Sequence, residues 1–63
     1  MYRYRLVDEA DGTDIGPLIS ARPTFAVGEK LARSPDERFE VVNIVEPEND
    51  NFRAYVIVRR LEA

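Results

Sequence analysis

The densest group of side chains that could do chemistry lies near the N-terminus and consists of four acidic residues, Asp8, Glu9, Asp11 and Asp14. Closely spaced carboxylates are the ligands that a hard cation such as calcium takes. The spacing does not match an EF-hand loop, because placing Gly12 at the obligatory glycine puts Leu18 where the bidentate acid belongs. The segment is therefore interpreted as a solvated turn, and no metal site is predicted.

Nucleophilic and acid–base catalysis have few candidate groups in this chain. It has no cysteine and no histidine, which removes thiolate nucleophiles, disulfides and imidazole bases. The hydroxyl groups thus have no histidine to activate them, and Lys30 is the only lysine. Carboxylate pairs are inevitable among 12 acidic residues, but a 63-residue fold has little room for a water-excluding cleft. We predict no enzymatic activity, no catalytic residue and no cofactor.

Arginines supply the remaining candidate surface. Four of them lie in the first and last apolar segments, namely Arg3, Arg5, Arg59 and Arg60. If these segments are strands that pair, the guanidinium groups come close together. With aromatic residues at its margin, such a patch would hold single-stranded nucleic acid through phosphate contacts and base stacking. The candidate aromatic residues are Tyr2, Tyr4, Phe52 and Tyr55.

A second interpretation of the same arginines is structural, and we favour it. They would form cross-strand ion pairs with Glu40, Glu46 or Glu62, which keep a sheet soluble and its edges unattractive to other chains. The aromatic residues fall in the apolar phase of their strands, which indicates core positions. The net charge of −3 also argues against bulk attraction to nucleic acid.

The elements that would position these residues begin with strands. Residues 2–7 alternate apolar and basic side chains, the period of a strand with one buried face. An acidic loop with Asp-Gly follows, and residues 17–21 are predicted to form an edge strand because Pro17 cannot donate a ladder hydrogen bond. Residues 52–61 form the last predicted strand, after a polar loop at 47–51.

The middle of the chain is less regular. Residues 24–33 fit either a helix capped by Thr24 or a turn at Gly28 followed by a strand at 29–33, and we favour the strand. Residues 34–37 match a helix-capping box, but the β-branched residues that follow favour a type I turn and a strand at 38–46. The apolar phase shifts within that strand, between Val41 and Val42, which predicts either a bulge or a strand buried on both sides.

These elements predict a single all-β domain over residues 1–63. We expect a small five-stranded antiparallel barrel of SH3-like topology, or a strongly bent sheet, in which the first and last strands pair. The alternative is an α+β fold with one short helix near 24–33. A chain of this size buries only about 60% of its extended surface, so a homodimer would add stability.

Four segments together resemble a group of small uncharacterised actinobacterial proteins with an SH3-like barrel topology. They are Tyr4-Arg5-Leu6-Val7-Asp8, Asp14-Ile15-Gly16-Pro17, Phe25-Ala26-Val27-Gly28-Glu29 and Val41-Val42-Asn43-Ile44-Val45. The resemblance spans most of the chain. It implies a barrel and a bacterial cytoplasmic protein, and it brings no activity, cofactor or catalytic residue.

The functional expectation follows from size and from the missing catalytic groups. We expect a non-catalytic module that presents a sheet face or a loop to a protein partner, which includes a second copy of itself. Binding of single-stranded nucleic acid through Arg3, Arg5, Arg59 and Arg60 is the alternative. A polyproline groove of the SH3 kind is not visible in the sequence, which lacks tryptophan. The expected location is the cytoplasm, with no membrane contact.

Overall fold

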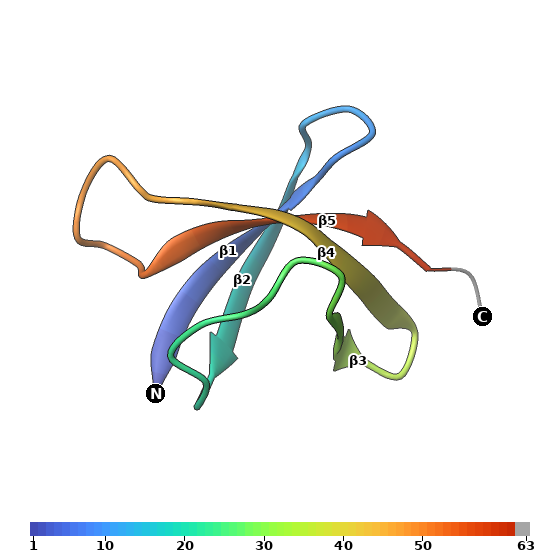
Figure 1. Cartoon of the computed structure of the whole chain (residues 1–63), viewed down its shortest axis with the longest axis horizontal. Coiled ribbons are helices and arrows are strands. Elements are labelled where there is room, and N and C mark those ends of the chain that lie inside the picture. The colour runs from blue at the N-terminus through green and yellow to red at the C-terminus, as the bar shows by residue number, and fades with distance from the viewer. Residues whose placement is uncertain (62–63) are drawn as a thin grey trace.

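The computed structural model describes residues 1–61, and in this range the chain forms five β-strands and no helix. The strands are β1 (Tyr2–Asp8), β2 (Asp14–Ser20), β3 (Lys30–Ser34), β4 (Glu37–Val45) and β5 (Ala54–Arg60). They make one curled sheet that forms a half-barrel (Figure 1). The predicted all-β class and the strongly bent sheet are therefore confirmed.

The alternative helix near 24–33 is not formed. Gly28 has a φ of 91°, which lies in the left-handed region and interrupts any right-handed helix at that point. The second half of the stretch forms β3, as the strand interpretation predicted. Since residues 1–61 contain no helix, none of them belongs to a helix long and apolar enough to cross a membrane.

The strand order is β2-β1-β5-β4-β3, so the first and last strands pair at the centre of the sheet as expected. They run parallel, however, with Leu6 opposite Val56, whereas every other pair is antiparallel. The sheet is thus mixed, which corrects the expectation of antiparallel strands throughout. Short loops force antiparallel neighbours, but no loop joins β1 to β5, so no hairpin forces these two strands to run antiparallel.

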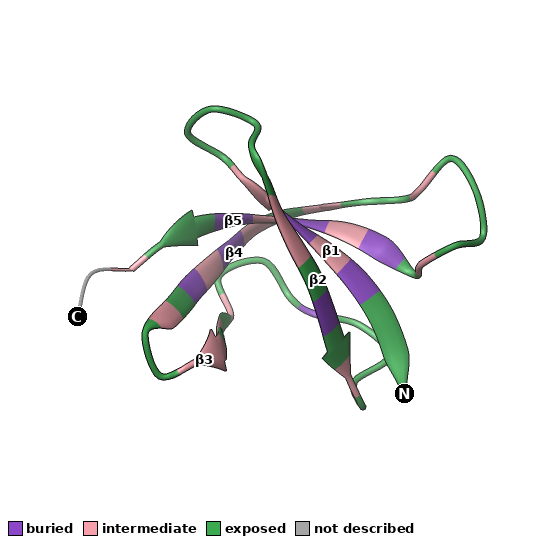
Figure 2. Ribbon diagram, turned by 180° about the vertical axis from the view of Figure 1, so that it is seen from behind, coloured by how far each residue is buried: buried purple, intermediate pink, exposed green. Residues whose placement is uncertain are grey.

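The core lies on the concave side of the sheet, where alternate residues of each strand point inward. The banding of buried and more exposed residues along β1, β4 and β5 shows this alternation (Figure 2). Nine residues form the buried cluster: Tyr4, Leu6, Leu18, Phe25, Phe39, Val41, Ala54, Val56 and Val58. Eight of the nine lie on strands, and Tyr4 and Leu6 occupy the face that the alternation of residues 2–7 predicted to be buried.

A bulge in β4 explains the phase shift seen in its sequence. The register with β5 shifts between Val41 and Asn43, which leaves Val42 as the extra residue. Val41 is fully buried, and Ile44 packs against the core from the next inward position. The bulge prediction is confirmed, and the bulge increases the local bend that the half-barrel needs.

The two outer strands, β2 and β3, leave a seam along the open side of the half-barrel, and Arg33 spans it. Its Nη1 donates to the carbonyl oxygens of Ile15 and Pro17 on β2, each at 3.3 Å. Its Nε donates to Glu37 at 3.2 Å, and its Nη2 also donates to Glu37. Because the carbonyl of Pro17 faces the seam, its nitrogen faces the seam as well, which is where an edge strand tolerates proline.

The segment 21–29 connects β2 to β3 across the concave side of the sheet and is called the strap (Figure 1). Phe25 is its buried anchor, with 6% of its surface exposed. The far end of the strap joins the sheet, where Gly28 N–H donates to the Val41 carbonyl at 2.7 Å and Val41 N–H donates to the Glu29 carbonyl at 2.8 Å. The strap therefore covers part of the core on the concave side.

Candidate functional site

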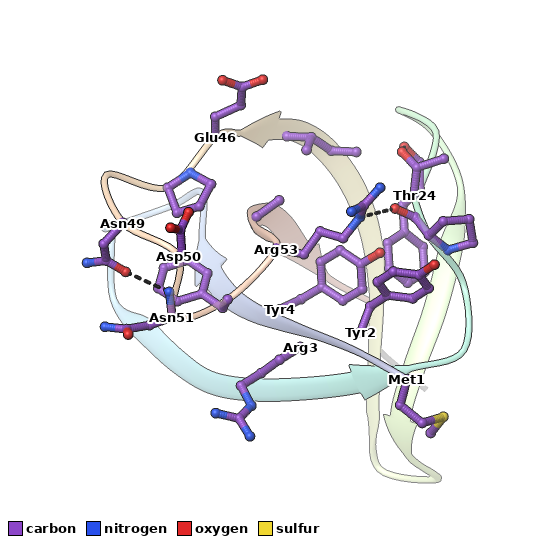
Figure 3. A pocket seen from close by; sticks show the side chains of 16 residues that line it. Met1, Tyr2, Arg3, Tyr4, Thr24, Glu46, Asn49, Asp50, Asn51 and Arg53 are labelled. Carbon is purple, nitrogen blue, oxygen red and sulfur yellow. Dashed lines mark hydrogen bonds between the residues drawn. The ribbon is translucent and has the colours of Figure 1, made fainter.

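A cleft of about 830 Å³ opens between the strap, the start of β1 and the loop 46–53 that joins β4 to β5. Figure 3 shows Tyr2, Thr24 and Arg53 on one side of it, Asn49, Asp50 and Asn51 on the other, and Tyr4 between them. Most of its lining residues are exposed, and only Tyr4, Phe25 and Ala54 among them are buried. The cleft is therefore a broad, open feature and not a closed cavity.

The cleft has a rigid aromatic floor. The rings of Tyr4 and Phe25 meet edge to face, with centroids 5.0 Å apart. The Tyr4 hydroxyl donates to the Arg22 carbonyl of the strap at 2.5 Å, so the buried hydroxyl is satisfied. This contact ties β1 to the strap, and the floor keeps its shape without a ligand.

Arg53 forms part of the wall and is held by three contacts. Its backbone N–H donates to the Arg3 carbonyl at 2.6 Å, and its Nε donates to the Pro23 carbonyl at 2.6 Å. Its guanidinium carbon lies 4.8 Å from the centroid of the Tyr2 ring, a cation–π distance. Neither Nη atom donates to another described residue, so the outer half of the guanidinium has donors to spare.

The opposite side of the cleft is polar and acidic. Glu46, Asn49, Asp50 and Asn51 line it, and Asn49 Oδ1 accepts from the Asn51 backbone N–H at 3.0 Å, which stabilises the loop. Neither carboxylate forms an ion pair within residues 1–61. Charges of both signs therefore line one cleft without neutralising each other.

Five of the six arginines outside the cleft form ion pairs within residues 1–61. The ion pairs are Arg5–Asp14, Arg22–Glu29, Arg33–Glu37, Arg59–Glu40 and Arg60–Asp8. Within the described range the arginines outside these pairs are Arg3, Arg38 and Arg53, and two of the three line the cleft. Both guanidinium groups of the cleft thus lack an acidic partner, as Arg38 does outside it, whereas the other five arginines each have one.

The four arginines predicted to form one patch do not lie together. Arg5 is in register with Tyr55, and Arg59 lies four positions further along β5, which is about 13 Å along the strand. Because β1 and β5 are parallel, Arg3 and Arg59 lie at opposite ends of the sheet. Arg60 faces the concave side instead, with its guanidinium carbon 5.6 Å from the Phe39 ring centroid.

The structural interpretation of these arginines is confirmed in part. Arg59 Nη2 donates to Glu40 Oε1 at 2.6 Å across β4 and β5, and this hydrogen bond raises the pKa of Arg59. Arg5 pairs with Asp14 at 2.7 Å, an acid that the prediction did not name. Glu46 forms none of the ion pairs of residues 1–61, and the suggested partner Glu62 lies outside that range.

The acidic segment after β1 forms the predicted turn. The carboxylates of Asp8, Asp11 and Asp14 each accept a backbone N–H two residues further on, at 2.9 to 3.0 Å. The hydrogen bonds from Thr13 lower the pKa of Asp11. In the described part of the chain, no three carboxylates gather closely enough to hold a metal ion.

Sequence reasoning missed the residues that make the cleft distinctive. Arg53 follows a polar loop and lies just before β5. The alternation of side chains along a strand does not predict that Arg53 contacts the strap. Tyr2 was placed at the margin of an arginine patch, but the arginine that it contacts is Arg53. The only feature of the sequence that could have indicated this cleft is Arg53 beside Phe52, together with Tyr2 and Tyr4 near the other end of the chain. Comparison with known proteins gives no match to a protein family, a curated protein or a solved structure.

Proposed function

We propose that this protein is a non-catalytic interaction module that holds a segment of a partner protein in the cleft between the strap and the loop 46–53. The observation that supports this most is the cleft itself, about 830 Å³ in volume and lined by aromatic, amide and charged side chains. Its proposed location is the bacterial cytoplasm, as the sequence resemblance implies.

The shape of the cleft favours a chain segment over a compact small molecule. Sites for small molecules usually bury 70% or more of the ligand in an enclosed cavity. Here both sides of the cleft are exposed and only the floor is buried. An extended peptide needs a surface of this kind, with an apolar floor for some side chains and polar groups at the rim for its backbone.

The exposed part of Tyr2 supports the same proposal. The side of the cleft formed by β1 carries Met1, 88% exposed, and Tyr2, 37% exposed. Exposed apolar and aromatic side chains beside a hollow are typical of protein-binding surfaces, where they become the buried anchors. A second copy of the chain is one partner that meets this description.

The test is a titration of the ¹⁵N-labelled chain with a pool of random hexapeptides, acetylated and amidated at their ends. We expect amide shifts confined to the cleft, at residues such as Thr24, Asn51 and Ala54. Sedimentation velocity on the same sample shows whether a second copy already occupies the surface. Absence of shifts in a monomeric sample, or shifts confined to another face, would overturn the proposal.

Two variants control this test. Tyr2→Ala removes the exposed ring from the cleft and should weaken binding. Ile19→Ala removes an exposed apolar side chain of β2, 57% exposed and outside the cleft, and should leave binding unchanged. Equal weakening by both variants would indicate a general loss of apolar surface rather than a site.

A further inference from the structure

We infer that the segment held in the cleft carries a carboxylate side chain, and that Arg53 is the residue that recognises it. This inference rests on the proposed function and names the chemistry of the partner. It is drawn from the way Arg53 is held and from its lack of an acidic partner.

The guanidinium of Arg53 is fixed before any ligand arrives. The hydrogen bond from Nε to Pro23 and the stacking on Tyr2 set both the position and the plane of the group. An arginine side chain normally loses rotamer freedom when it forms an ion pair. The contacts of Arg53 already restrict its side chain in the free protein. The entropic cost of ordering this side chain on ligand binding is therefore smaller.

The donors that remain are suited to a carboxylate. With Nε engaged, Nη1 and Nη2 keep N–H groups that no described residue accepts. The planar fork of a guanidinium matches the two oxygens of a carboxylate, and such charge-assisted bonds are roughly twice as strong as neutral ones. A backbone carbonyl or an amide can accept one of these bonds but cannot neutralise the charge.

The acids of the protein itself do not take this position. Asp50 is three residues from Arg53 in the same loop, and Glu46 lines the same cleft, yet neither forms an ion pair with it. In Figure 3 the Asp50 side chain lies with Asn49 and Asn51, across the cleft from the Arg53 guanidinium. The contacts to Tyr2 and Pro23 hold the cation away from these acids, which leaves it available to a partner.

The opposite side of the cleft sets the direction of the segment. A carboxylate bound at Arg53 is across the cleft from the Asp50 carboxylate. A carboxylate bound at Asn49 or Asn51 would lie beside Asp50 and be repelled by it. We therefore expect the acidic residue of the partner at the strap side and uncharged or basic residues at the loop side. Arg3, which also lines the cleft, adds positive potential near the β1 rim.

The experiment uses three pools of random hexapeptides, acetylated and amidated, in which the third residue is fixed as Glu, Gln or Lys. Each pool is titrated into the ¹⁵N-labelled full chain at low and moderate salt. We expect the Glu pool to bind about tenfold more tightly than the Gln pool, the size of one charge-assisted hydrogen-bond pair. The ratio should fall as salt screens the exposed pair.

Arg53→Gln should equalise the affinities for the Glu and Gln pools. Arg53→Lys keeps the charge without the fork, so it should retain part of the preference. The matched control is Arg38→Gln, because Arg38 is another exposed arginine without an ion pair and lies outside this cleft. It should leave the tenfold ratio intact.

Each remaining outcome is informative. If no pool shifts the cleft residues, the proposed function fails and this inference fails with it. If all pools bind in the cleft equally, or if the Lys pool binds best, the interaction site stands and the role of Arg53 is refuted. A Glu preference that persists in Arg53→Gln would assign the recognition to another residue, of which Arg3 is the nearest in the cleft.

Discussion

An arginine lies at the seam between β2 and β3, and another lies at the cleft beside the strap. They are Arg33 and Arg53. At the seam, every nitrogen of the Arg33 guanidinium donates within the protein, to Ile15, Pro17 and Glu37. At the cleft, only the Nε of the Arg53 guanidinium donates to a described residue, and the guanidinium carbon lies 4.8 Å from the centroid of the Tyr2 ring. The first arginine closes an edge, and the second keeps donors for another molecule.

The difference shows how one residue type serves stability and binding in the same small domain. Unpaired strand edges are templates for pairing with other chains, and Arg33 occupies two carbonyls of β2 that a foreign strand would use. The cleft is lined mainly by exposed residues of the strap, the start of β1 and the loop 46–53. An interaction there does not open the sheet, so the fold can tolerate it.

The largest expected effect concerns the strap, which forms one side of the cleft. Phe25→Ala should lower the free energy of unfolding by about 3–5 kcal/mol, because it removes a buried ring and leaves a cavity beside Tyr4. Urea denaturation measures this loss. Val27→Ala, at a side chain of the same strap that is 67% exposed, should change stability by less than about 0.5 kcal/mol.

If Phe25→Ala does not fold, Phe25→Leu tests the same contact with a smaller cavity and a loss below about 1.5 kcal/mol. Equal, small effects of the Phe25 and Val27 variants would show that the strap is not anchored in the core. The strap would then be a surface segment like the cleft and not a structural part of the fold.

The next effect concerns the seam. Gly16 has a φ of 126°, and a Cβ at this position would lie 2.9 Å from Arg33 Nη1. Gly16→Ala should therefore cost about 1–3 kcal/mol, mainly from the backbone conformation. In an Arg33→Ala background the loss should be smaller, because the side-chain contact is gone and only the backbone strain remains. Identical losses in the two backgrounds would contradict a contact across the seam.

A smaller effect comes from the charge pair that holds Arg33. The hydrogen bond from Arg33 lowers the pKa of Glu37 below its ordinary value of 4.5. The stability that this pair contributes is therefore fully present above that value and is lost as the pH falls through the lowered pKa of the folded state. Urea midpoints of the wild type and Glu37→Gln should differ at pH 7 and converge in acid.

Arg33→Gln supplies the control for this prediction, because Glu37 then has no guanidinium partner. In that background, Glu37→Gln should have little effect at either pH. A wild-type advantage that persists below the lowered pKa of Glu37 would show that the carboxylate acts through packing and not through its charge.

The smallest effect on stability is expected at the cleft. Tyr2→Ala should change the urea midpoint by less than the equivalent of about 0.5 kcal/mol, since Tyr2 is 37% exposed and is not part of the buried core. It should nevertheless weaken peptide binding, because the guanidinium loses the surface that orients it. A large loss of stability would make Tyr2 a structural residue and would weaken the case for a binding site.

Much of the fold was predictable because local chemistry specifies it. The alternation of residues 2–7 identified β1, Pro17 identified an edge strand, and the phase shift at Val41 identified the bulge of β4. The candidate site was not predictable to the same degree. Of the four arginines proposed for a surface, only Arg3 lines the cleft, and Arg53 was not considered.

The sequence by itself determined which segments become strands, which face of residues 2–7 is buried, and where the turns fall. These properties depend on neighbours within a few residues, through side-chain alternation, proline and glycine. Only the tertiary structure decided that β1 and β5 run parallel, because no loop joins them and local sequence therefore does not specify their relative direction. That direction separates Arg3 from Arg59 and brings Arg3 beside Arg53, which places the free guanidinium groups at the cleft.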